Sequence, residues 1–147
     1  MADNDLTAIR KGFKAVIESV LPSPGQGGPT VYERSRSGMS VPFILIRPVS
    51  GRRERMQQAR RSYQFVITLA LGKGMDDANW EARMDDYLAT NGAFSIEAAI
   101  LSEPTLDGSA ELVNVDEFSG YGEEIIVNGM QYAGAQILIT VWGKEPA

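Results

Sequence analysis

The stretch YQFVITLAL, residues 63–71, decides the fold class of this chain. Aromatic or aliphatic side chains at every odd position alternate with Gln64, Val66, Thr68 and Ala70, which is the two-residue period of a β-strand. Aromatic and β-branched residues are also the types that favour strands. We therefore predict a half-buried strand over residues 62–71, with an aromatic-rich face directed to a hydrophobic core.

Further strand patterns lie on both sides of this stretch. Residues 128–129 read Asn-Gly, a strong signal for a two-residue hairpin, and a long apolar run follows them. Both faces of that run are partly apolar, which indicates a central strand or one packed against a partner. The other predicted strands are 30–33, 41–47, 111–116, 124–127 and 131–142.

A charged segment, residues 48–61, separates two of the predicted strands and contains few apolar side chains. It would join residues 41–47 to residues 62–71 as a hairpin connection of fourteen residues. Connections of that length are more often functional or mobile than structural. We therefore expect a long loop between two central strands, reaching outward from the sheet.

Two or three helices complete the pattern. Apolar residues that recur at spacings of three and four predict an amphipathic helix, which Pro22 ends. Gly92 lies beyond the end of a second helical pattern as a C-cap. The predicted helices are 4–21, 76–90 and 95–101. The fold class is therefore α+β: a mostly antiparallel β-sheet with two or three α-helices packed on one face, in a single domain of residues 1–147.

Composition excludes several kinds of site. The chain has no cysteine and no histidine, which excludes disulfides, thiolate metal sites and histidine-based catalysis. Asp77, Glu81 and Asp85 share one helix face, but a solvated face explains them better than a cation site, because such sites usually need backbone oxygens. No apolar run approaches the ~20 residues of a membrane span, and no secretory signal is expected. We expect no enzymatic activity, no catalytic residue, no metal, no cofactor and no membrane partner.

Charge is distributed unevenly along the chain, whose formal net charge is −5. Residues 34–61 hold eight arginines and one acid, whereas residues 62–147 hold three basic and fourteen acidic residues. The basic segment could be a solvated loop, a patch for duplex phosphates, or an assembly surface that meets the acidic remainder of another copy. It lacks interleaved aromatic residues, which argues against stacking on single-stranded bases, and the arginine fork suits carboxylates. The candidate interface residues are Arg47, Arg52, Arg53, Arg55, Arg60 and Arg61.

The layout of the chain resembles the tail-terminator and tail-completion proteins of long-tailed bacteriophages, the group that includes the lambda-type tail terminator. An amphipathic helix, a Gly/Pro loop and VYE at residues 31–33 come first. PFI at 42–44, the long loop, YQFVITL at 63–69 and a helix follow. The chain then reads NGMQYAGAQILITVW over residues 128–142, whose YAGA turn is the most family-like piece.

This resemblance implies a structural virion protein, synthesised in the host cytoplasm and located at the head–tail junction. Such proteins form a hexameric ring that caps the tail tube, terminates its polymerisation and joins the tail to the head connector. The implied partners are further copies of the chain, the tail-tube protein and the connector or neck protein, while DNA passes through the channel without sequence-specific binding. In that family the sheet builds the inner ring and long loops reach neighbours, a role that would fall to residues 47–61. The alternatives are a head–tail joining or tail-tube protein of the same fold, or a small DNA-binding module that uses residues 34–61.

Overall fold

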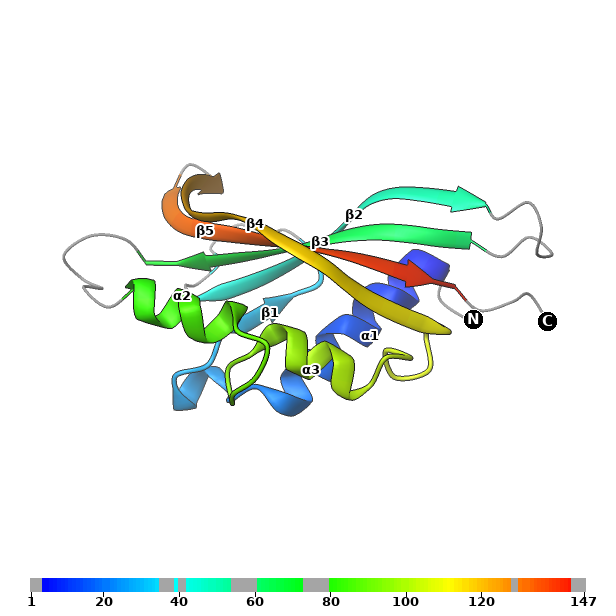
Figure 1. Ribbon diagram of the computed structural model, residues 1–147, viewed down its shortest axis with the longest axis horizontal. Helices are drawn as coiled ribbons and strands as arrows, with labels where there is room; N and C mark the ends of the chain where they lie inside the picture. The colour runs from blue at the N-terminus through cyan, green and yellow to red at the C-terminus, as the bar shows by residue number, and fades with distance from the viewer. Residues whose placement is uncertain are drawn as a thin grey trace.

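The computed structural model describes residues 4–34, 39, 42–53, 61–72, 80–127 and 130–143. Five strands form one sheet in the order β1-β2-β3-β5-β4, with three α-helices beside it (Figure 1). All neighbouring strands are antiparallel except β1 and β2. The predicted α+β class is thereby confirmed. The elements are α1 (Asp5–Val20), a 3-10 turn (Pro24–Gln26), β1 (Thr30–Tyr32), β2 (Phe43–Arg53), β3 (Arg61–Leu71), α2 (Trp80–Leu88), α3 (Ile96–Ser102), β4 (Leu112–Val127) and β5 (Met130–Trp142).

The centre of the sheet is β3, the strand that the alternating sequence pattern predicted. It lies between β2 and β5, and its odd-numbered side chains from Tyr63 to Leu71 are buried against the helices. The apolar stripe of α1 covers this face, and the rings of Phe13 and Phe65 lie 5.4 Å apart. Burying one large apolar side chain contributes about 1.5–3 kcal/mol, so this face dominates the stability of the domain. All three helices lie on the same side of the sheet (Figure 1).

A smaller apolar cluster lies on the opposite face of the sheet. Phe43 and Leu45 alternate with the helix-facing residues of β2 and are buried together with Met39 and Ala70. The Phe43 ring packs edge-on against Tyr132 on β5, at 5.3 Å between centroids. Only one end of this face is therefore apolar, and its other end carries polar and charged residues.

The helices begin and end where side chains satisfy their free backbone groups. The Asn4 side chain accepts a hydrogen bond from the amide of Thr7 at 2.9 Å and caps α1. Ser95 caps α3 in the same way, through the amide of Ala98 at 3.0 Å. The first and third predicted helices are confirmed. The second is confirmed over residues 80–88, and its predicted first turn at residues 76–79 lies outside the described residues.

The prediction of a fourteen-residue loop between two strands is wrong. β2 continues to Arg53, which pairs with Arg61, so only residues 54–60 connect the strands, and these lie outside the described residues. The register shifts between Pro48 and Ser50, which leaves Val49 as an extra, exposed residue. A bulge can contain a proline, which donates no hydrogen bond to a neighbouring strand. The extra residue also interrupts the alternation of side chains by which a strand is predicted.

The expected separate strands at residues 111–116 and 124–127 form one bulged strand, β4. Its register against β5 shifts between Val115 and Glu117 and again between Ser119 and Glu123. Gly120 and Gly122 adopt positive φ angles of 68° and 71°, which glycine reaches without steric cost. The pairing of Val127 with Met130 confirms the two-residue hairpin connection predicted at residues 128–129. The predicted six strands are therefore five.

Candidate functional site

The candidate interface arginines lie mainly on strands and not in a loop. Arg47, Arg52 and Arg53 belong to β2, and Arg61 is the first residue of β3. Arg55 and Arg60 lie outside the described residues. The hairpin of β2 and β3 thus fixes the backbone of four of the six positions, which makes them part of the sheet.

One outer edge of the sheet is basic. β1 pairs with β2 only from Phe43 to Leu45, so no described strand pairs with the outer edge of β2 beyond Leu45. The uncovered part of β2 contains three arginines and no acidic residue. An unpaired strand edge can accept another strand, and charged residues on an edge are one way in which proteins limit such pairing.

The other outer edge of the sheet is acidic. Among the described strands β4 pairs only with β5, and its sixteen residues include Asp116, Glu117, Glu123 and Glu124 but no basic residue. The Asp116 carboxylate accepts hydrogen bonds from Thr140 Oγ1 and from Asn114 Nδ2, both at 2.6 Å. Its negative charge is therefore held in place at the sheet surface, because both hydrogen bonds come from neighbouring strand residues.

Opposite charges share one row of this sheet. Arg47 pairs with Val66, Val66 with Leu138, and Leu138 with Glu117, so the four residues lie side by side on the face away from the helices. Three strand spacings separate Arg47 from Glu117, a distance of about 14 Å. The two charges are too far apart to pair within one copy.

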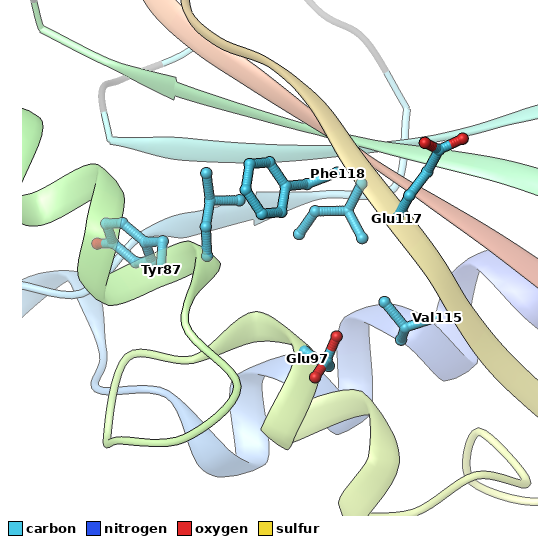
Figure 2. A pocket seen from close by; sticks show the side chains of 7 residues that line it. Tyr87, Glu97, Val115, Glu117 and Phe118 are labelled. Carbon is cyan, nitrogen blue, oxygen red and sulfur yellow. The ribbon is translucent and has the colours of Figure 1, made fainter.

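Apolar side chains accompany the acidic residues of β4. Phe118 is 52% exposed and Ile126 is 67% exposed, and Leu112 is also exposed. Phe118 lies over a small cavity between β4 and helices α2 and α3, and the Glu117 carboxylate is directed away from Glu97 (Figure 2). The cavity volume is about 60 Å³, which is room for about two water molecules and too little for a substrate. The exposed apolar side chains of β4 therefore form part of a surface and not of a ligand pocket.

The helix face with three predicted acidic residues does not form a cation site among the described residues. Glu81 and Asp85 are on α2 and exposed, whereas Asp77 lies outside the described residues. Tyr121 donates a hydrogen bond to Asp85 Oδ1, which raises the pKa of Tyr121 to about 12. Within the described ranges, no three His, Cys, Asp or Glu residues are grouped to hold a metal, and no helix is long and apolar enough to cross a membrane.

The sequence patterns did not predict two features of the surface. Arg10 belongs to the helix that was assigned to the core, yet its guanidinium lies beside Arg34 and Arg47. Tyr121 lies between two glycines of positive φ, and this Gly-Tyr-Gly spacing was the available signal for a bulge that turns a side chain toward a helix.

No protein-family model matches the chain, and no curated protein matches it in sequence. The charges at the two sheet edges, together with the resemblance in layout, therefore carry the functional proposal.

Proposed function

We propose that this protein is a structural component of a phage virion that forms a closed ring of identical copies. The ring caps the tail tube, ends its polymerisation and joins the tail to the head connector. The observation that carries the proposal is a pair of sheet edges with opposite charge that no further described strand covers, β2 with three arginines and β4 with four acids. The ring size of six and the tail location come from the resemblance in layout.

The charged edges favour one kind of contact between copies. A ring of identical subunits uses two different surfaces on each copy, and the basic edge of one copy can then meet the acidic edge of the next. Arginine forks bind carboxylates through two parallel hydrogen bonds, and paired strand edges add backbone hydrogen bonds. Exposed Phe118 on β4 and exposed Val49 on β2 supply apolar area at the same two edges.

The proposed partners are further copies of the chain, the tail-tube protein and the connector, with DNA passing through the ring. This role needs neither a cofactor nor a catalytic residue. A head–tail joining or tail-tube role rests on the same resemblance and the same edges, and differs in which protein the ring touches. Binding to isolated tail tubes distinguishes a terminator from a joining protein that binds heads.

Native mass spectrometry and light scattering over a range of concentrations, with and without tail-tube protein, test this proposal. We expect a discrete ring whose formation is promoted by tail tubes and weakened by salt, because charged contacts at a surface are screened. A protein that stays monomeric under all of these conditions and binds no tail tube would contradict it. A cryo-electron micrograph of the particle would then locate the ring at the tail end.

A further inference from the structure

Three arginines from different parts of the chain line one open hollow. Arg10 comes from α1, Arg34 from the turn after β1, and Arg47 from β2. The hollow has a volume of about 410 Å³, and its remaining lining is the first turn of α1: Asn4, Leu6 and Thr7. Two of these arginines belong to the basic segment of the sequence, and the fold adds the third.

Two of the three guanidinium groups are held by hydrogen bonds to neutral atoms. Arg10 Nη1 donates to the carbonyl oxygen of Glu33 at 2.7 Å and, more weakly, to that of Ile46 at 3.5 Å. Arg34 Nη2 donates to Thr7 Oγ1 at 3.0 Å. Each guanidinium has five N–H donors, and the hydrogen bonds to described residues use only some of them. Arg10 and Arg34 are therefore positioned before any ligand arrives, which lowers the entropic cost of binding one.

Among the side chains that the structure describes, only Glu33 offsets part of the positive charge of Arg10. Burial lowers the pKa of Arg10 below its ordinary value, and the nearby charges of Arg34 and Arg47 lower it further. Glu33 acts in the opposite direction, but its carboxylate forms no ion pair with these three arginines within the described residues. Three gathered cations repel one another, and an anion between them would remove that repulsion.

We propose that this hollow binds a phosphate group through Arg10, Arg34 and Arg47. Phosphate presents several oxygens at once, and arginine forks recognise them in pairs. The first turn of α1 lies at the same hollow, where the partial positive charge of the helix N-terminus adds to the attraction. The open hollow leaves access for a phosphodiester of duplex DNA as well as for free phosphate or pyrophosphate. The site shares Arg47 with the basic edge proposed for ring formation, whereas Arg10 and Arg34 belong to the hollow alone.

Calorimetric titration of the full chain with sodium pyrophosphate at low salt measures the site directly. We expect saturable binding with one pyrophosphate per chain. The variants Arg34→Gln and Arg47→Gln should each weaken it about tenfold, because each removes charged hydrogen bonds to the ligand. Arg61→Gln is the matched control, since it removes the same charge about 16 Å further along the sheet and should leave binding unchanged.

Titration with a duplex of 12 base pairs identifies the source of the phosphate. If DNA is the natural source, duplex affinity exceeds pyrophosphate affinity and falls steeply with salt, and Arg47→Gln reduces the salt slope by about 1. If free phosphate is the source, pyrophosphate binds and the duplex competes poorly. Either result supports the site. Circular dichroism of each variant confirms that the fold is kept.

Two results would overturn the inference. One is the absence of both pyrophosphate and duplex binding at low salt in folded protein. The other is an equal loss of affinity in Arg61→Gln and Arg47→Gln, which would assign binding to the general positive charge of the hairpin. The variant Arg10→Lys separates the contribution of the charge from that of the guanidinium fork, because a lysine keeps the charge but loses the fork. This variant should weaken binding without abolishing it.

Discussion

The hydroxyl of Tyr121 donates a hydrogen bond to Asp85 Oδ1 at 2.5 Å and links strand β4 to helix α2. The two residues lie 36 positions apart in the chain, and Tyr121 also donates to the backbone carbonyl of Glu81 at 3.2 Å. The link is possible because the double-glycine bulge turns Tyr121 out of the strand register. It therefore ties the acidic edge of the sheet to the helical layer.

This link gives the protein a pH dependence at alkaline pH. The pKa of Tyr121 is raised to about 12 from its ordinary value of 10, mainly by its hydrogen bond to Asp85. A raised pKa means that the neutral phenol stabilises the folded state below about pH 10, and that this stability is lost as pH rises toward 12. Urea unfolding at pH 8, 10 and 11.5 should show this loss, and Tyr121→Phe should lack that component. Equal pH dependence in both proteins would contradict the assignment.

Replacing Gly120 by alanine tests the bulge. Its φ angle of 68° lies in the left-handed region, where an alanine side chain is strained. We expect Gly120→Ala to lower the free energy of unfolding by about 1–2 kcal/mol. Gly25→Ala is the control, because its backbone is not in that region and an added Cβ would meet no atom within 4 Å. Both values come from urea denaturation, and equal stability of the two variants would show that the bulge is not strained.

Replacing Gly12 by alanine tests how closely α1 packs. A Cβ at this position would lie 2.3 Å from the carbonyl oxygen of Leu106, a buried residue of the turn before β4. Alanine in a helix ordinarily stabilises it by up to about 1 kcal/mol relative to glycine. Here we expect the opposite sign, with a loss of about 2 kcal/mol or more, because backbone must move. A rise in the thermal unfolding midpoint would contradict this packing.

Charge reversal at the two sheet edges tests the proposed contact. A basic-edge variant, Arg47→Glu with Arg52→Glu, and an acidic-edge variant, Glu117→Lys with Glu123→Lys, should each assemble at least about tenfold more weakly than the original protein. An equimolar mixture should recover assembly, because alternating copies place opposite charges at every contact. Native mass spectrometry would detect equal numbers of both variants in each ring.

The same experiment has a built-in control. Glu18→Lys reverses an exposed charge on α1, which is part of neither edge strand, and should leave assembly unchanged. Failure of the mixture to assemble, with both variants folded, would exclude a contact between the basic and acidic edges.

The sequence predicted the elements whose side chains alternate or repeat without interruption. Residues 63–71 lie at the centre of the sheet, buried on the helix side, so their period is clean. The end of β2 was missed because Pro48 and the bulge at Val49 interrupt the period, and because few core contacts select apolar residues there. The bulges of β4 divided one strand into two for the same reason.

The sequence predicted the chemistry of the candidate site but not its geometry. The unequal charge distribution identified the arginines, but strand order decides which edge each of them occupies, and strand order depends on long-range pairing. The grouping of Arg10 with Arg34 and Arg47 depends in addition on how α1 crosses the sheet. Neither relationship has a local sequence signal.

The row that joins Arg47 to Glu117 also gives the subunit a direction. A two-fold dimer built on either edge would set arginine against arginine or acid against acid, and like charges placed opposite each other are destabilising. Head-to-tail contact avoids this conflict and keeps every copy in the same orientation. The two rims of an assembly built in this way are chemically different, so it can meet one kind of neighbour above and another below.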